Sequence, residues 1–328
     1  MKTKVLLILL LTISVKVYSQ DGKFDKGDKK EIIDSIIFQL KDKYVFPDVA
    51  DLMAKDLIKR YKRGEYNGIK SKKIFADSLT SHLYTISKDK HIGVSYDKEM
   101  ASRLRTPKKE EDEAKKFKRV NERVRKFNYG FEELKIMEGN IGYIKITAFA
   151  PTKYGGKTAV STMQFVSNCD ALIFDLRVNF GGDPTMIQFL ISYLYTEEPV
   201  HLNDFYYRKQ NKTTQFWTLP FVPGKRMPKV PVFVLTSDKT ISAGEEFAYD
   251  LKNLKRATII GETTAGAANF GEEFIARGNF IVWVPIGRAI NPITKTNWEG
   301  KGVEPNIKVK SDETLDVAYK MALEKLKE

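Results

Sequence analysis

Three features on which many enzymes depend are scarce in this chain: cysteine, histidine and glycine-rich nucleotide motifs. The single cysteine, Cys169, excludes an intramolecular disulfide, and its apolar surroundings predict a buried side chain. The three histidines, His82, His91 and His201, show no metal-ligand spacing. Neither a Walker motif nor the pattern G-x-G-x-x-G is present. The sequence therefore predicts neither a metal centre nor a bound cofactor.

Long apolar runs are equally scarce, and the one that occurs is at the N-terminus. There "MKTKVLLILLLTISVKVYSQ" combines Lys2 and Lys4 with an apolar run over residues 5–15 and the small residue Ser19. This order is typical of a secretory signal peptide, and the run is short for a membrane span, which needs about 20 residues. We expect residues 1–19 to be cleaved and the protein to be exported, periplasmic or secreted, with no stable membrane anchor. An uncleaved anchor is the alternative.

The formal net charge of the 328 residues is +13. Three of those charges, on Lys2, Lys4 and Lys16, lie in the signal segment, which leaves about +10 on the mature chain. The lysines are scattered among aspartates and glutamates, a pattern that favours a solvated basic surface and argues against a nucleic-acid partner. Hydrophobic residues make up 42% of the chain, enough for a sizeable core.

The first part of the mature chain, residues 20–100, is predicted to be a small helical domain that ends in a strand. Segments such as "EIIDSIIFQL" and "KKIFADSLTSHLYTIS" repeat apolar residues at helical spacing. Ile92 and Val94 then alternate with polar neighbours, which predicts a strand with His91 at its start. Residues 101–128 carry charges of both signs and one apolar stripe, as expected of a charged connecting helix.

Residues 129–328 show a different pattern, in which apolar strands alternate with helices. "DALIFDLRV" and "VPVFVLTS" are apolar without alternation, as in strands covered on both faces. Each is followed by a helical pattern, and "GNIGYIKITAF", "RATIIGE" and "NFIVWVPIG" read as further strands. This alternation predicts an α/β core with a largely parallel sheet.

Two strand-to-helix junctions, "DLRVNFGGDP" and "TSDKTISAGEE", carry the residues of chemical interest. Catalytic groups of open α/β sheets gather beyond the carboxyl ends of the strands. Ser242 either caps the helix, with Glu245 closing a capping box, or is a nucleophile at a tight turn. The backbone amides at Gly181–Gly182 and Ala243 could form an oxyanion hole.

A serine nucleophile needs a base. His82 lies on an apolar helical stripe and His201 in an ordinary loop or edge segment, which leaves His91 by elimination. A lysine base is the competing solution.

Several separated motifs carry a family resemblance. "DLRVNFGG", "TSDKTISAGEEFAYDLKNLKRATIIGETTAGAA" and "NPITKTNWEGKGVEPNIKV" occur in that order, and "DKHIGVSYD" precedes them. Together they resemble the tail-specific (C-terminal-processing) serine peptidases, above all the branch that contains interphotoreceptor retinoid-binding protein and the tricorn core protease. The resemblance covers nearly all of the mature chain.

The resemblance implies a ClpP/crotonase-like core, a small N-terminal helical domain and no PDZ domain. It also implies that Ser242 is the nucleophile, with the oxyanion hole at Ala243 and the Gly181–Gly182 turn. The lysine-using branch carries its base at the position of Ala267, so this chain resembles the histidine-using branch. His91 would then be the base, and Glu299 of "WEGKG" would orient it.

The expected function is that of an exported serine peptidase that acts on a polypeptide, such as an extended or C-terminal segment, without metal or cofactor. The alternative is a non-catalytic carrier of a retinoid-like or lipid-like ligand on the same fold. In that case Phe270, Trp283 and Trp298 could line an apolar cleft. Retention of a serine, a histidine and a glutamate at matching motif positions argues for the peptidase.

Overall fold

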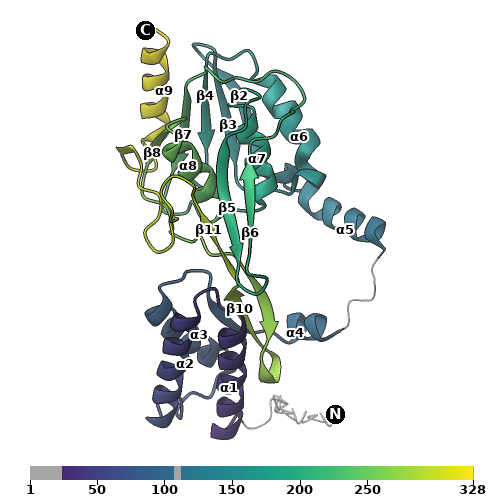
Figure 1. Cartoon of the computed structure of the whole chain (residues 1–328), viewed down its shortest axis with the longest axis vertical. Helices are drawn as coiled ribbons and strands as arrows, with labels where there is room; N and C mark the ends of the chain where they lie inside the picture. The colour runs from purple at the N-terminus through teal and green to yellow at the C-terminus, as the bar shows by residue number, and fades with distance from the viewer. Residues whose placement is uncertain (1–23, 107–111, 328) are drawn as a thin grey trace, which may run out of the picture.

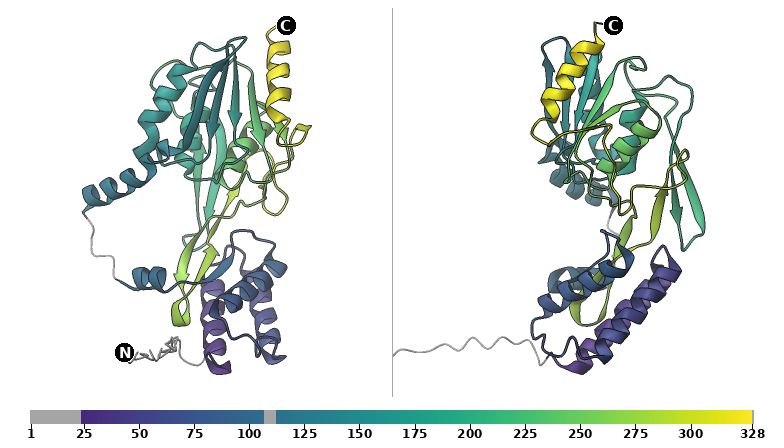
Figure 2. Two further views of the ribbon diagram at one scale, coloured as in Figure 1. Left: turned by 180° about the vertical axis from the view of Figure 1, so that it is seen from behind. Right: turned by 90° about the vertical axis from the view of Figure 1, so that its left-hand side faces the viewer.

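The computed structural model describes residues 24–106 and 112–327 (Figure 1). The expected signal peptide, residues 1–19, lies outside the described residues. Two bodies can be seen, a helical one that holds α1–α3 and an α/β one that holds the C-terminal helix, with long strands running between them (Figures 1 and 2). Among the described residues no helix has both the length and the apolar character that a membrane crossing requires.

The helical body is built on three amphipathic helices that pack around one core. They are α1 (Lys26–Lys43), α2 (Pro47–Lys62) and α3 (Lys72–Ser87). Each begins with a recognisable signal: Asp25 and Ser71 cap the first and third with side-chain oxygens, and Pro47 opens the second. Their inward residues include Ile33, Met53 and Leu79, all with no exposed surface. The helices expected from periodicity are therefore present.

A small antiparallel sheet completes the helical body, and two of its three strands come from the far end of the chain. Strand β1 (Gly93–Tyr96) pairs with β10 (Phe280–Pro285), which pairs with β9 (Gly271–Ile275). Phe280, Val282 and Val284 point into the core of α1–α3. Consequently residues 271–285 fold with the N-terminal helices, although the sequence pattern groups them with the C-terminal part.

The α/β body is organised around a six-stranded sheet in the order β12-β8-β7-β4-β3-β2. All neighbours are parallel except β2 and β3, which confirms the predicted α/β class. The strands are β2 (Phe131–Met137), β3 (Ile141–Ile146), β4 (Ala171–Asp175), β7 (Val232–Thr236), β8 (Thr258–Gly261) and β12 (Ile307–Lys308).

Helices cover both faces of this sheet, which explains why its central strands are apolar throughout. One face packs against α6 (Thr152–Phe165), α7 (Pro184–Ser192) and α8 (Ala243–Asn253). The other packs against α9 (Thr314–Lys325), whose Ala318 and Ala322 are fully buried. β4 and β7 are buried along their whole length.

The remaining elements link the two bodies or border the sheet. A second three-stranded sheet has the order β11-β5-β6, and the sequence pattern does not predict its hairpin. These elements are β5 (His201–Tyr207), β6 (Lys212–Trp217), β11 (Gly287–Ile290), α4 (Lys98–Arg105), α5 (Glu113–Arg125) and two short 3-10 turns, Asn128–Gly130 and Arg277–Asn279.

Candidate active site

Ser242 lies at the turn between the buried strand β7 and helix α8, in a backbone conformation that few residues adopt. Its φ is 58° and its ψ is −119°, a strained region for a residue with a side chain. The Ser242 residue is half-buried. Strained strand-to-helix turns of this kind hold the nucleophilic serine of α/β-hydrolases.

Glu245 holds this turn, and its role is larger than that of a first-turn charge. The carboxylate accepts the Ser242 N–H at 2.9 Å and the Ala267 N–H at 2.8 Å on one oxygen. It accepts the Gly266 N–H and the Thr264 hydroxyl, both at 2.5 Å, on the other. Burial raises the pKa of Glu245, and these four donors oppose the shift. The strained turn is thus fixed by a fully buried side chain.

The first glycine of the first junction, Gly181, lies against the serine, and Gly182 lies against the Phe149 backbone. A Cβ on Gly181 would come within 2.8 Å of the Ser242 Cβ and 3.2 Å of the Ala243 nitrogen. The φ values of Gly181 and Gly182 are 86° and 144°, which side chains disfavour. The two junctions expected to share one site therefore meet in space.

Backbone N–H groups near Ser242 that have no acceptor in the protein are candidates to bind an oxyanion. The Gly181 N–H already donates to the Asn179 side-chain oxygen at 2.8 Å. In the described part of the chain the N–H groups of Gly182 and Ala243 have no protein acceptor. Ala243 is the first residue of α8, where the free amides and the helix dipole favour negative charge.

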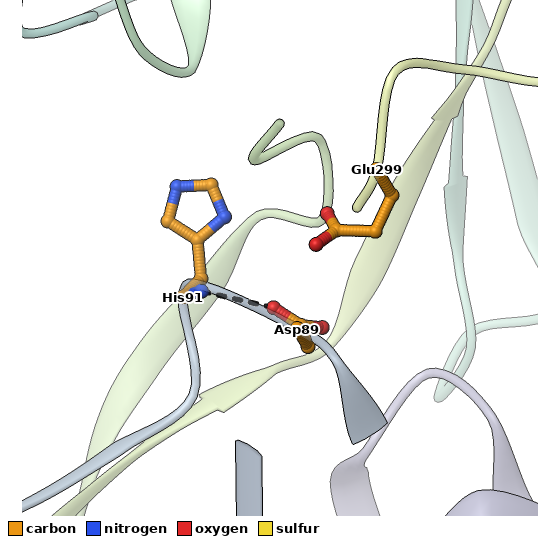
Figure 3. A group of neighbouring side chains, drawn as sticks. All are labelled: Asp89, His91 and Glu299. Carbon is orange, nitrogen blue, oxygen red and sulfur yellow. Dashed lines mark hydrogen bonds between the residues drawn. The ribbon is translucent and has the colours of Figure 1, made fainter. Parts of the chain in front are cut away.

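His91 lies in the turn between α3 and β1, in the helical body. Its ring is half-buried, and its Nδ1 is buried without a hydrogen-bond partner. The backbone N–H donates to Asp89 Oδ1 at 2.9 Å, which fixes the turn (Figure 3). Burial lowers the pKa of His91, so that the imidazole is neutral and able to act as a base at physiological pH.

Glu299 reaches the same place from the segment that follows β11 (Figure 3). Its Oε2 accepts the N–H groups of Ala268 and Asn269 at 2.6 and 2.9 Å, and its Oε1 accepts the Lys90 N–H at 3.4 Å. Side-chain donor atoms of Asp89, His91 and Glu299 lie within 4.8 Å of one another. The structure therefore brings His91 and Glu299 together.

A two-carboxylate, one-imidazole group could in principle hold a divalent metal ion. Here, however, both carboxylates already accept several N–H and O–H groups: Asp89 accepts three and Glu299 accepts three. These hydrogen bonds hold both carboxylates in place beside the imidazole.

Residues 264–269 connect the serine half of the site to the histidine half. Consecutive amides in this segment bind first Glu245, which holds Ser242, and then Glu299, which lies beside His91. In the described residues no hydrogen bond joins the His91 ring to the Ser242 hydroxyl. Catalytic hydrogen bonds are often long without substrate and tighten in the complex.

The other two histidines have structural partners. His82 accepts or donates a hydrogen bond with the Tyr66 hydroxyl at 2.9 Å, and His201 binds Asp204 at 2.7 Å and stacks on Trp217. Cys169 is buried, and burial raises the pKa of its thiol. Both other histidine rings therefore already have protein partners.

Two parts of the chain match known protein families. The sequence profile of peptidase family S41 matches residues 140–309. The chain belongs to this family. It is a serine-type peptidase, and residues 27–127 match the N-terminal domain of peptidase S41 in eukaryotic IRBP.

Solved structures show the same fold as this S41 peptidase. A candidate peptidase from Parabacteroides merdae has a TM-score of 0.63 and 18% identity, over 90% of this chain and 96% of its own. Mature CPAF complexed with lactacystin has a TM-score of 0.60 and 13% identity, over 92% and 98%. The photosystem II D1 C-terminal processing protease has a TM-score of 0.51 and 13% identity, over 87% and 94%.

Close contact between Gly181 and Ser242 in the S41 peptidase gives a first prediction. Gly181→Ala places a methyl group 2.8 Å from the Ser242 Cβ at a φ of 86°, so the serine must move. We expect kcat to fall by about 10²-fold, since small displacements at a reacting group cost this much. Peptide-hydrolysis kinetics measure it. The matched control is Gly156→Ala, on α6, where the nearest atom is 4.0 Å away; an equal loss in both variants would contradict the prediction.

Helix α8 of the S41 peptidase buries two acidic residues. Glu246 is 5% exposed and Asp250 is fully buried. Burial raises the pKa of Glu246 to about 8, and burial together with the Glu246 charge raises the pKa of Asp250. Asn291 donates to Asp250 Oδ1 at 3.3 Å, while Oδ2 has no partner. Ionising this pair in the fold is therefore unfavourable.

This pair predicts that stability falls as pH rises. Below about pH 3 both acids are protonated in the folded and unfolded states, because their ordinary pKa values are about 4. Between there and about pH 8 the unfolded chain releases protons that the fold retains, so the free energy of unfolding decreases. Glu246→Gln should raise that free energy at pH 8 by roughly 1–3 kcal/mol and change little at pH 4. Urea unfolding at both pH values, with exposed Glu138→Gln as control, tests this; a gain that is equal at both would contradict it.

Proposed function

We propose that this S41 peptidase is exported and hydrolyses peptide bonds through an acyl-enzyme on Ser242. His91 is the general base, Glu299 orients it, and the N–H groups at Ala243 and the Gly181–Gly182 turn bind the oxyanion. The observation that carries the proposal is the meeting of the two strand-to-helix junctions at Ser242, with the segment 264–269 reaching from that turn to Glu299.

In the acylation step the Ser242 oxygen forms a bond to the peptide carbonyl carbon while its proton passes to His91. The carbonyl oxygen becomes an oxyanion, which free amides stabilise where charge develops. The tetrahedral intermediate then collapses, the C–N bond breaks, and His91 returns the proton to the leaving amine.

Deacylation repeats these steps with water. His91 takes a proton from water as the oxygen attacks the ester carbonyl, and the serine hydroxyl is restored when the C–O bond to Ser242 breaks. Glu299 steadies the imidazolium in both steps. Of the two candidate amides at the glycine turn, the Gly182 N–H is the one without a protein acceptor in the described chain, and we assign the second donor to it.

Two of the three aromatic residues that the carrier alternative would use are engaged in internal packing, and the third, Trp283, is 37% exposed. Trp298 is 2% exposed and donates its ring N–H to the Ala267 carbonyl at 2.9 Å. Phe270 packs edge-on against Phe205 and Tyr207. Both side chains are therefore occupied by internal packing. A cavity of about 540 Å³ beside Arg177 is lined mostly by charged residues, which does not suit an apolar ligand.

Casein and an internally quenched peptide library test the proposal, with fragments identified by mass spectrometry. We expect turnover by the mature chain that a serine-directed inhibitor abolishes. Native mass spectrometry of the same sample checks the alternative: a co-purified lipid together with no turnover would contradict the peptidase and favour the carrier. Export is tested separately, by the N-terminal residue of protein recovered from outside the cytoplasm, which we expect near residue 20.

A further inference from the structure

A second carboxylate lies beside His91, and the function proposed above gives it no role. Asp89 is 1% exposed and precedes His91 by two residues. It accepts the Tyr44 hydroxyl at 3.1 Å, the Asn269 side-chain amide at 2.9 Å and the His91 backbone N–H at 2.9 Å. A buried carboxylate with three donors is a group whose charge the fold is built to hold.

Asn269 fixes this carboxylate relative to Glu299. Its side-chain amide donates to Asp89 and its backbone N–H donates to Glu299, both at 2.9 Å. One residue therefore sets the spacing of the two acids, and both lie within 4.8 Å of a ring nitrogen of His91 (Figure 3). Since Asp89 and His91 share the helical body while Asn269 and Glu299 follow β8 and β11, the cluster also joins the two ends of the chain.

The two carboxylates beside the His91 imidazole differ in how readily they ionise. Burial, followed by the charge of Asp89, raises the pKa of Glu299 to about 7. Burial also raises the pKa of Asp89, but its three donors and the nearby imidazole oppose the shift. Burial lowers the pKa of His91, and the charge that opposes this is that of Asp89. Tyr44, whose pKa is raised by burial and by Asp89, stays a neutral donor.

We propose that Asp89 is a positioning residue for His91, and that its carboxylate supplies the negative charge that stabilises the protonated imidazole, with Glu299 as the second member of the pair. The inference rests on the proposed function in that His91 is the general base. Lys90, a charged neighbour in sequence, directs its ammonium group to the Ala265 carbonyl. Among the described residues, the titratable side chains grouped with the His91 ring are Asp89 and Glu299.

Histidine titration by nuclear magnetic resonance tests this directly, because the chain has three histidines. In the ¹⁵N-labelled mature protein, Asp89→Asn should lower the His91 pKa by about one unit. Glu299→Gln should change it by less, because the Glu299 carboxylate is already bound by three backbone N–H groups and the charge that acts on His91 is that of Asp89. The control is Asp97→Asn, which removes the same charge at the exposed N-cap of α4 and should leave His91 unchanged.

Two outcomes would overturn the proposal. If the His91 pKa changes in Glu299→Gln but not in Asp89→Asn, the stabilising charge belongs to Glu299 alone. If the His91 pKa changes in neither variant, neither acid stabilises the protonated imidazole. Unchanged titration of His82 and His201 verifies the fold. If Asp89→Asn does not fold, Tyr44→Phe serves: it removes one donor to Asp89, so a smaller drop in the His91 pKa is expected and an unchanged value counts against Asp89.

The titration measures the His91 pKa and needs no catalytic activity. A negative result for Asp89 can therefore be told apart from a failure of the proposed peptidase function. In the hydrolysis assay, Asp89→Asn should lower kcat by about 10-fold to 100-fold with KM nearly unchanged, as expected when an interaction formed only in the transition state is lost. A rise in KM with kcat intact would instead indicate a substrate-binding role and contradict positioning.

Discussion

Replacing Ser242 by alanine is expected to lower kcat/KM for peptide hydrolysis by about 10⁴-fold or more, because no acyl-enzyme can form without the hydroxyl. The substitution should leave the fold intact. Alanine has the same Cβ as serine at the strained φ of 58°, and the bond from the Ser242 N–H to Glu245 does not involve the side chain. Thermal unfolding of the variant should therefore match that of the wild-type chain within a few degrees.

An exposed serine offers a matched control for this experiment. Ser161 lies on α6 with its side chain in solvent, and Ser161→Ala should retain full activity. Steady-state kinetics on one internally quenched peptide compare the three proteins. Residual activity within tenfold of wild type in Ser242→Ala would show that another group performs the attack.

Removal of the base is the second large effect that we expect. His91→Gln should lower kcat/KM by about 10³-fold to 10⁴-fold, since a serine hydroxyl without a base is a weak nucleophile. His82→Gln is the control, because that ring is held by Tyr66 in the helical body and has no place in the proposed chemistry.

A variant that lacks both Ser242 and His91 tests whether the two residues act together or independently. If Ser242 and His91 act as a unit, the variant that lacks both should be about as slow as either single variant. Losses that multiply would mean that the two residues act in separate steps or sites, and the proposed pairing would fail.

Much of the fold follows from local patterns in the sequence. Three-residue and four-residue spacing of apolar side chains predicts α1 and α3, and the unbroken apolar runs predict β4 and β7 as strands covered on both faces. The strand-to-helix turn at Ser242 is also local information, because "SAGEE" supplies both the turn and its buried glutamate.

Long-range pairing is what the sequence does not reveal. Strand β10 pairs with β1, roughly 185 residues earlier in the chain, and with β9 it completes the helical body; no local periodicity encodes this partner. For the same reason, the sequence pattern does not predict the four hydrogen bonds to Glu245 or the position of Asp89 beside His91. The spacing Asp-x-His was the available signal for Asp89, but its Tyr44 and Asn269 donors come from distant segments.

The most direct test of the central claim is the site of covalent modification by a fluorophosphonate, which reacts with activated serine hydroxyls. The mature protein would be treated with the reagent, its intact mass would be measured, and its digest would be mapped by mass spectrometry. We predict one adduct per chain on Ser242, and none in Ser242→Ala or His91→Gln. An unmodified wild-type protein, or an adduct that persists in Ser242→Ala, would contradict the account.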